Sequence, residues 1–245
     1  QKGPITKMLK AAIFDLDGTL AYTFEDIRTS IDEMRHAYSL PPISDEDMIR
    51  IVNFVARDFA AQGLGGEKRS EEEINKALDI YTASYAKHYL DKTTIYEGLP
   101  EVLKALKKDG IKLAVYSNKM DAYVKKIMIH LYGEGIFDVL MGPDGIKPKP
   151  DPMGALIIAE KWGLSPSEIA FVGDSVLDIK TGLAAGMTSI GVSWGYTKKE
   201  LLKEAGAEYI VDTRPELLAL LKKLSGKQIG LKAEQKVCNN ISDIA

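Results

Sequence analysis

The sequence predicts an α/β fold, with a doubly wound, Rossmann-like parallel sheet as the core and an inserted, all-helical cap domain. Three observations lead to this prediction. Short apolar runs alternate with helical patterns along most of the chain, which is typical of a parallel sheet with helices on both faces. Most of these runs are continuously apolar, as in strands that are buried on both sides. One interval between two runs far exceeds the roughly 30 residues of a strand-helix-strand unit, and helical patterns fill it.

Each expected strand is a short run bounded by Gly, Asp, Asn or Ser. The runs are 11–14, 111–116, 137–141, 169–172, 189–192 and 208–211. The expected helices are 100–109, 121–132, 152–162, 176–186, 198–205 and 214–224. Because helices alternate with these strands, we expect parallel strands whose carboxyl ends meet at one rim, where ligands bind in this fold class.

The long interval carries apolar residues at helical spacing on three stretches. They are Ile27, Ile31, Met34 and Tyr38; Met48, Val52, Val55 and Phe59; and Ile74, Ala77, Tyr81, Tyr85 and Tyr89. Ser44 and Ser70 stand where helix N-caps belong, and Ser70 has the capping-box spacing to Glu73. We therefore expect a core of residues 8–22 and 96–226, a helical cap of residues 23–95 above the rim, and a C-terminal tail of residues 227–245. Hinges are expected near 21–23 and 96–98.

Composition limits the function classes. The net charge of −3 and the pI of about 5.8 provide no basic stripe for nucleic acid. No apolar stretch approaches the roughly 18 residues of a membrane span, and no signal peptide is visible. The single cysteine, Cys238, rules out an internal disulfide and fits a reducing compartment. We expect a cytoplasmic protein that acts on a small molecule and does not bind nucleic acid or membranes; its oligomeric state is not readable from the sequence.

Acidic residues stand at the ends of two expected strands. Asp15 and Asp17 of DLDGT follow the run 11–14, and Asp174 and Asp178 of GDSVLD follow the run 169–172. Neighbouring carboxylates repel one another, and a carboxylate at the edge of a core is unfavourable unless it is neutralised. A Mg²⁺ ion, which prefers hard oxygen ligands, would neutralise them.

The other strand ends add groups that suit a phosphate. Ser117 and Asn118 follow the run 111–116, and the proline-rich loop GIKPKPDP carries Lys147 and Lys149. Together these groups match phosphoryl transfer. An aspartate attacks phosphorus, a lysine and a metal stabilise the transferred group, and a second carboxylate moves the proton of the leaving alcohol.

These motifs, in this order, resemble those of the haloacid dehalogenase-like hydrolase superfamily, in its phosphatase branch with a helical cap. The resemblance covers about residues 8–224. The closing stretch GYTKKELLKEAGAEYIVDTRPEL resembles phosphoglycolate phosphatases and their close relatives. The family implies a Mg²⁺-dependent phosphatase that hydrolyses a small phosphorylated metabolite through an aspartyl-phosphate intermediate.

The resemblance also implies a role for each motif residue. Asp15 is the nucleophile and Asp17 the general acid/base. Mg²⁺ is held by Asp15, the backbone carbonyl of Asp17 and Asp174, and Asp178 supports this metal site. The phosphate is bound and stabilised by Ser117 and Lys147, and Thr19 and Asn118 are further substrate-binding residues. Lys147 is preferred to Lys149 because it occupies the first position of the family's K-P-x-P pattern.

Two other functions remain open. A phosphosugar mutase of the β-phosphoglucomutase type shares the cap and the aspartate pair, but such mutases tend to have an acid before the fourth-motif aspartate, where this chain has Gly173. A regulator that binds phosphate or Mg²⁺ without catalysis is the alternative from another class. Phosphoglycolate, sugar phosphates, pyrophosphate and nucleoside monophosphates all remain possible substrates. The cap segment 51–66 departs from the glycine-containing pattern of phosphoglycolate enzymes.

Overall fold

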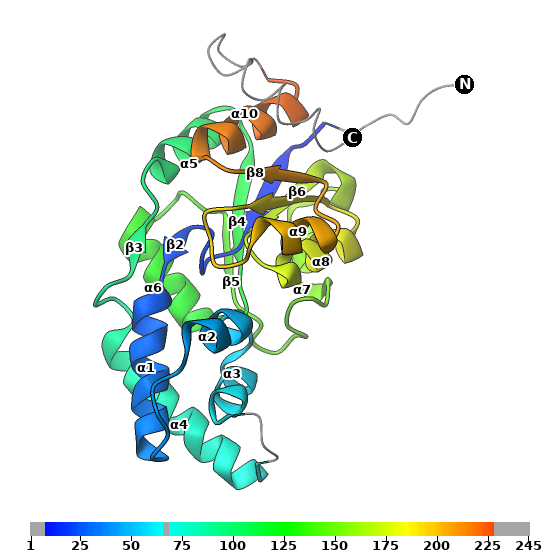
Figure 1. The fold of residues 1–245 in the computed structure, drawn as a ribbon. Coiled ribbons are helices and arrows are strands. Elements are labelled where there is room, and N and C mark those ends of the chain that lie inside the picture. Colours follow the sequence, from blue (N-terminus) through cyan, green and yellow to red (C-terminus); the bar gives the residue numbers. More distant parts are fainter. Residues whose placement is uncertain (1–7, 66–68, 228–245) are drawn as a thin grey trace.

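The computed structural model describes residues 8–65 and 69–227, and its core is one parallel sheet (Figure 1). The strands are β1 (Ala11–Phe14), β4 (Lys112–Tyr116), β5 (Val139–Met141), β6 (Ile169–Gly173), β7 (Thr188–Val192) and β8 (Tyr209–Val211). Their spatial order is β5-β4-β1-β6-β7-β8, and all neighbours are parallel. The strand order reverses between β1 and β6, where this class of sheet opens its ligand-binding crevice. The predicted fold class is confirmed.

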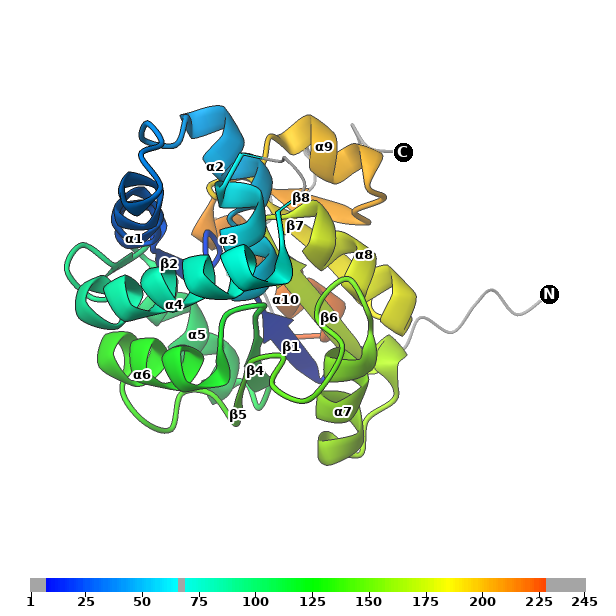
Figure 2. The ribbon, with the colours of Figure 1, turned by 90° about the horizontal axis from the view of Figure 1, so that it is seen from below.

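Helices cover both faces of the sheet (Figure 2). On one face lie α5 (Leu99–Lys108), α6 (Asp121–Tyr132) and α10 (Arg214–Leu224); on the other lie α7 (Met153–Trp162), α8 (Val176–Ala185) and α9 (Lys199–Glu204). A short 3₁₀ turn, Pro166–Glu168, precedes β6. Successive strand residues point to opposite faces, so Ala12 and Phe14 pack beneath the first group and Ala11 and Ile13 beneath the second. Every residue of β1 is therefore buried, as its unbroken apolar run predicts.

Four helices between β2 and β3 form a separate layer at the strand ends (Figure 1). They are α1 (Phe24–Ala37), α2 (Asp45–Ile51), α3 (Ala56–Gly63) and α4 (Glu71–His88). Their apolar faces meet in a hydrophobic cluster of their own, which includes Ile31, Met48, Phe59 and Tyr85. The predicted caps are confirmed: Ser44 accepts from the backbone N–H of Asp47, and Ser70 forms a capping box with Glu73. The stretch from Met48 to Phe59 is two helices rather than one.

The two linkers to this helical layer form a structure that the sequence did not predict. β2 (Ala21–Tyr22) and β3 (Thr94–Ile95) pair antiparallel as a two-stranded sheet. The chain thus leaves the core and returns to it at the same place. Among the described residues, no helix has the length and apolarity of a membrane span. The N-terminal residues 1–7, Cys238 and nearly all of the tail 227–245 lie outside the described residues.

Candidate active site

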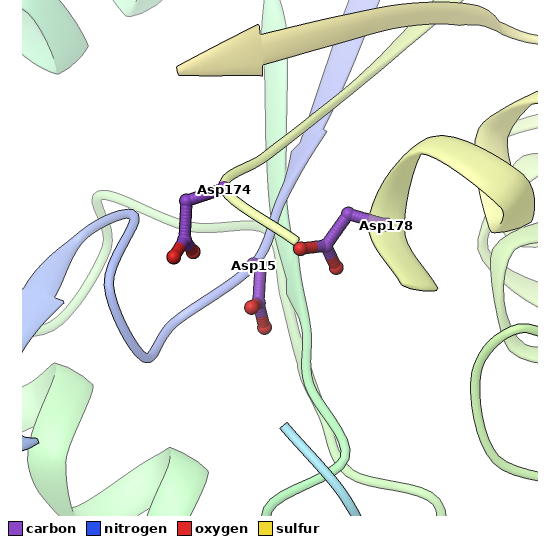
Figure 3. A group of neighbouring side chains, drawn as sticks. All are labelled: Asp15, Asp174 and Asp178. Atoms are coloured by element: carbon purple, nitrogen blue, oxygen red, sulfur yellow. The ribbon is translucent and has the colours of Figure 1, made fainter. Parts of the chain in front are cut away.

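Three buried carboxylates meet at the switch point of the sheet (Figure 3). Asp15 directly follows β1, Asp174 directly follows β6, and Asp178 lies in the first turn of α8. One ligand oxygen from each lies within 4.8 Å of the others, and all three residues are buried. The structure thus brings together three of the acidic residues that the sequence singled out.

The electrostatics of this cluster favour a bound cation. Burial raises the pKa of Asp15 to about 7, and repulsion from Asp178 adds to the increase. Burial also raises the pKa of Asp174 well above its usual value, and the charges of Asp178 and Asp15 act in the same direction. A divalent cation would relieve both effects. Because carboxylate oxygens are the donors that Mg²⁺ prefers, the residues present fit this ion.

Glycines allow the backbone to pass close to these carboxylates. A Cβ atom at Gly18, whose φ is +80°, would lie 2.3 Å from Asp174 Oδ2, and one at Gly195 would lie 2.2 Å from Asp174 Cβ. A Cβ atom at Gly173 would lie 2.3 Å from the side chain of Asp178. Such overlaps require displacement of the carboxylates. Gly173 stands where mutases of the β-phosphoglucomutase type tend to have an acid, and close packing against Asp178 explains the glycine here.

We expect Gly173→Ala to destabilise the protein by about 1–3 kcal/mol, the usual range for overpacking, and to reduce activity by moving Asp178. Gly191→Ala in β7 is the matched control, because its Cβ atom would first meet a methyl group of Leu202 at 3.2 Å. Urea denaturation and initial rates measure the two effects. Equal losses in both variants would show that the clash with Asp178 is not the cause.

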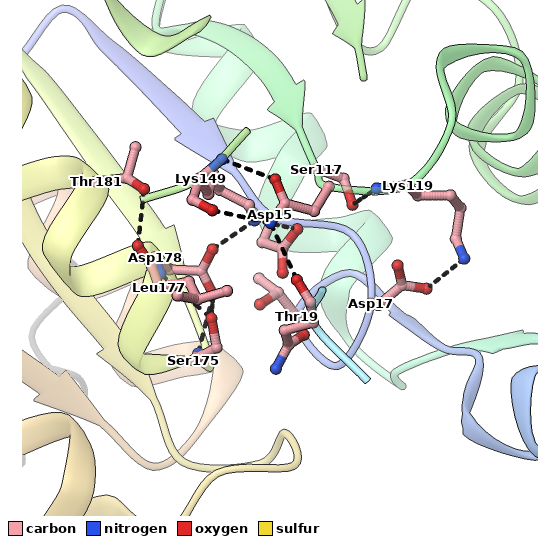
Figure 4. Close-up of polar contacts among 12 residues, drawn as sticks. Asp15, Asp17, Thr19, Ser117, Lys119, Lys149, Ser175, Leu177, Asp178 and Thr181 are labelled. Atoms are coloured by element: carbon pink, nitrogen blue, oxygen red, sulfur yellow. Dashed lines mark hydrogen bonds and ion pairs between the residues drawn. The ribbon is translucent and has the colours of Figure 1, made fainter. Parts of the chain in front are cut away.

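The lysine beside the cluster is Lys149 (Figure 4). Its Nζ lies 2.8 Å from Asp15 Oδ1 and 2.6 Å from Asp178 Oδ1, and its side chain is 2% exposed. Burial alone would lower the pKa of Lys149, but the charges of Asp15 and Asp178 outweigh it and raise the pKa above its usual value. The lysine therefore remains cationic within the site.

Lys147, the residue preferred from the sequence, does not reach the site. Its side chain is 73% exposed, and its Nζ lies 3.8 Å from Asp151 Oδ2 at the surface. The sequence contains two overlapping matches to K-P-x-P, namely KPKP starting at Lys147 and KPDP starting at Lys149. The pattern alone could not choose between them. The structure corrects the choice to Lys149, because only this side chain enters the rim.

Asp17 lies apart from the three-carboxylate cluster. The hydroxyl of Thr23 donates to Asp17 Oδ1 at 2.5 Å, and Lys119 Nζ lies 3.2 Å from the same oxygen. Lys119 is itself buried, with its ammonium group 4.6 Å from the centre of the Tyr85 ring on the cap. The two aspartates of DLDGT thus have different surroundings: Asp15 lies among carboxylates and Asp17 between two donors.

Thr19 and Ser117 differ in what they offer a substrate. The hydroxyl of Thr19 donates to Asp174 Oδ1 at 2.8 Å, so its single proton orients that carboxylate. The expectation that Thr19 binds substrate stays a prediction. Ser117 is buried at the end of β4, and its oxygen accepts from the backbone N–H of Lys119 at 3.2 Å. Because Ser117 acts as acceptor there, its own hydroxyl proton is not used in that contact.

Asn118 joins three parts of the site through peptide groups. Its Oδ1 accepts from the backbone N–H of Lys149 at 2.8 Å, and its Nδ2 donates to the backbone oxygen of the same residue at 3.1 Å. The same Nδ2 also donates to the backbone oxygen of Asn53 on the cap, at 3.0 Å. Both ends of the side-chain amide are therefore engaged. Asn118 therefore holds the lysine loop and the cap, and its expected contact with substrate stays a prediction.

A cavity of about 30 Å³ lies between the core and the helical layer. Asp15, Asp17 and Lys149 form part of its core side, and Phe59 and Tyr85 part of its cap side. A volume of this size holds one or two water molecules. The space between the core and the helical layer is thus narrow at the carboxylate cluster.

Three residues with contacts at the site were missing from the sequence prediction: Lys119, Thr23 and Tyr196. Lys119 directly follows Ser117 and Asn118, so its place after a strand end was a usable signal. The backbone N–H of Tyr196 donates to Asp174 Oδ2 at 2.8 Å. Tyr196 belongs to the closing stretch GYT, which marked a resemblance but carried no chemical assignment.

Comparison with known proteins matches residues 12–192 to the haloacid dehalogenase-like hydrolase family. N-acetylmuramic acid 6-phosphate phosphatase from Pseudomonas aeruginosa is 34% identical over 215 residues, which cover 87% of this chain and 95% of that protein. Phosphoglycolate phosphatase 1 from the same organism is 29% identical over 219 residues, covering 87% and 80%. The crystal structure of a predicted phosphoglycolate phosphatase from Haemophilus somnus has a TM-score of 0.78 and 27% identity, covering 86% of this chain and 97% of that one.

Proposed function

The chain belongs to the haloacid dehalogenase-like hydrolase family and is a phosphatase of that family, and on this premise we propose that it hydrolyses a small phosphorylated metabolite through an aspartyl phosphate formed on Asp15, with Mg²⁺. The observation that carries the proposal is the difference in surroundings between two aspartates. Asp15 belongs to the carboxylate cluster and pairs with the ammonium of Lys149, whereas Asp17 stands two residues further along the chain with its own donors.

In the first step, a carboxylate oxygen of Asp15 bonds to phosphorus while the bond from phosphorus to the ester oxygen breaks. The leaving oxygen takes a proton from the carboxyl group of Asp17. Lys149 lies 2.8 Å from Asp15, so its charge falls close to the oxygens of the transferred group and stabilises them. The hydroxyl of Ser117 can donate to one of the same oxygens.

In the second step, Asp17 acts in the opposite direction. Its carboxylate accepts a proton from water, and the water oxygen bonds to phosphorus while the bond from phosphorus to Asp15 breaks. Inorganic phosphate leaves and the carboxylate of Asp15 is restored. Asp17 has then regained the proton that it gave up in the first step, so the cycle is balanced.

Mg²⁺ would be held by Asp15, Asp174 and the backbone carbonyl of Asp17. When bound, the ion neutralises negative charge on the cluster and on the phosphate. Asp178 supports this arrangement from beside the ligands, because its Oδ1 pairs with Lys149 and its Oδ2 accepts from the backbone and hydroxyl of Ser175. Thr19 and the backbone of Tyr196 fix the two oxygens of Asp174.

For the substrate, we propose phosphoglycolate or N-acetylmuramic acid 6-phosphate, the compounds named in two of the relatives. Residues 23–95 act as the cap that admits and selects the substrate, since its side chains form one wall of the cavity. The core of residues 8–22 and 96–226 carries the chemistry. The cap opens to admit substrate and closes over it in each cycle, as mobile lids do in many enzymes.

We expect Mg²⁺-dependent release of phosphate from at least one member of a panel containing these two esters, glucose 6-phosphate, AMP and pyrophosphate. Chelation with EDTA lowers the rate by about 100-fold or more, because charge stabilisation by a catalytic metal is worth several kcal/mol. Asp174→Asn raises the Mg²⁺ concentration needed for half-maximal rate. Asp79→Asn, which removes an exposed carboxylate on α4, is the matched control and leaves it unchanged. Full turnover in EDTA would reject the metal requirement.

A further inference from the structure

Tyr196 contacts two parts of the site at once. Its backbone N–H donates to Oδ2 of Asp174, a proposed metal ligand, at 2.8 Å. Its side-chain hydroxyl accepts from the backbone N–H of Thr23 at 3.0 Å and lies 3.2 Å from the hydroxyl of Thr23. Thr23 is the N-cap residue of α1 and directly follows β2, so it is the first residue of the helical layer after the linker. One tyrosine therefore links the candidate metal ligand to the hinge.

The direction of the hydroxyl contacts follows from counting protons. The hydroxyl of Thr23 has one proton, and it donates that proton to Asp17 Oδ1 at 2.5 Å. In the contact between the two hydroxyls, Tyr196 must therefore be the donor and Thr23 the acceptor. The result is a directed chain of hydrogen bonds from Tyr196 through Thr23 to Asp17. Because Tyr196 also accepts from the backbone N–H of Thr23, its hydroxyl holds that residue by two bonds.

This chain selects one oxygen of Asp17. Thr23 and Lys119 both contact Oδ1, from the hinge and from the loop after β4. Oδ2 has neither of these contacts, so it is the oxygen that remains for the leaving group. A threonine hydroxyl that is free to rotate would release Oδ1 and let the carboxylate turn.

The ring of Tyr196 is held rigidly enough for this task. It packs against Phe24 at a centroid distance of 5.2 Å and against Tyr22 at 6.2 Å, and both of these residues flank Thr23. Rotation of the ring would break aromatic contacts with both neighbours. The hydroxyl thus has a fixed position relative to the hinge.

We propose that Tyr196 is a positioning residue for the hydrolysis: through the hydroxyl of Thr23 it fixes the carboxyl group of Asp17 so that Oδ2 meets the leaving oxygen. The inference rests on the proposed role of Asp17 as general acid and base. It also couples the hinge to the chemistry, because the hydroxyl that holds Asp17 belongs to a residue that moves when the cap moves.

Tyr196→Phe tests the proposal, because it removes the hydroxyl but keeps the ring and the backbone N–H that binds Asp174. We expect kcat/KM for an alkyl phosphate to fall about tenfold, within the range of general acid catalysis. For p-nitrophenyl phosphate, whose leaving group needs no proton, we expect a loss below about twofold. The Mg²⁺ concentration for half-maximal rate stays at the wild-type value.

Two threonine variants and one tyrosine variant provide the controls. Thr23→Val, which lacks the relaying hydroxyl, reproduces the loss that is confined to alkyl phosphates, and Thr23→Ser restores the alkyl phosphate rate. Tyr22→Phe removes a hydroxyl from the same aromatic group; within the described residues this hydroxyl bonds to Glu25 alone, and its loss leaves both rates unchanged.

Equal losses with both esters in Tyr196→Phe, or a changed Mg²⁺ requirement, would overturn the inference in favour of a general packing role. An unchanged Tyr196→Phe would also overturn it, provided that Asp17→Asn shows a loss of kcat/KM confined to alkyl phosphates, since kcat/KM reports the phosphorylation of Asp15 and not the later hydrolysis. If Asp17→Asn itself lacks that selectivity, the proposed role of Asp17 fails first. The two failures are therefore distinguishable.

Discussion

We expect Asp15→Asn to abolish turnover, whereas Asp17→Asn leaves an enzyme that is phosphorylated slowly and loses its phosphate more slowly still. Asp15→Asn removes the attacking carboxylate, and we expect a rate loss of roughly 10⁴-fold or more with every substrate. The variant has no carboxylate at position 15 that can form the aspartyl phosphate.

Asp17→Asn acts differently, because Asp15 remains intact. Loss of general acid–base catalysis lowers turnover by about 10²–10⁴-fold while the substrate still binds. With p-nitrophenyl phosphate the first step needs no proton from the enzyme, so the aspartyl phosphate on Asp15 still forms. The second step needs Asp17 to activate water, and the aspartyl phosphate therefore accumulates.

Intact-protein mass spectrometry after rapid quenching detects the phosphate adduct. We expect a labelled protein for Asp17→Asn and no label for Asp15→Asn, with peptide mapping placing the phosphate on Asp15. A merely structural role for both carboxylates predicts similar losses and no label in either variant. Phosphate on Ser117, or undiminished turnover in Asp15→Asn, would reject the assignment of the nucleophile.

The two lysines of the proline-rich loop are expected to differ sharply. Lys149→Met leaves Asp15 and Asp178 buried without their shared cation, and removal of one partner from a buried ion pair costs about 3–5 kcal/mol. It also removes charge stabilisation from the transferred group, for which a rate loss of about 10²–10³-fold is typical of one lost donor. Both effects come from the same 2% exposed side chain.

Lys147→Met is the matched control two residues earlier. Its exposed ammonium pairs with Asp151 at the surface and with no other residue that the structure describes, so we expect stability within about 0.5 kcal/mol of wild type and an unchanged rate. Urea denaturation and initial rates measure the two variants side by side. If Lys147→Met proves the inactive variant and Lys149→Met the active one, the family pattern as first applied is right and the assignment of Lys149 is wrong.

The parallel sheet and the acidic residues at its rim followed from simple rules. Continuous apolar runs predicted buried parallel strands, and parallel strands bring their carboxyl ends to one rim. Asp15 and Asp174 met there because each directly follows a strand on either side of the switch point. Residues tied to regular structure in this way are within reach of sequence reasoning.

Side chains on loops were harder to place from the sequence. Lys147 and Lys149 match the same pattern, and only the path of the loop decides which of them is buried. Thr19 and Asn118 lie at the rim as expected, but their polar atoms are engaged by Asp174 and by peptide groups. Such assignments depend on hydrogen bonds between segments far apart in sequence, which no local pattern encodes.

The pairing of β2 with β3 determines how the helical layer relates to the rest of the chain. Because its two ends leave the sheet side by side, the distance between them does not depend on what lies between. The entropy of closing such a loop grows only slowly with its length, so the core tolerates inserts of very different size at this point. The insert is in this sense a replaceable module. If the insert selects the substrate as proposed, its exchange at the paired strands would change the substrate without altering the residues that carry the chemistry.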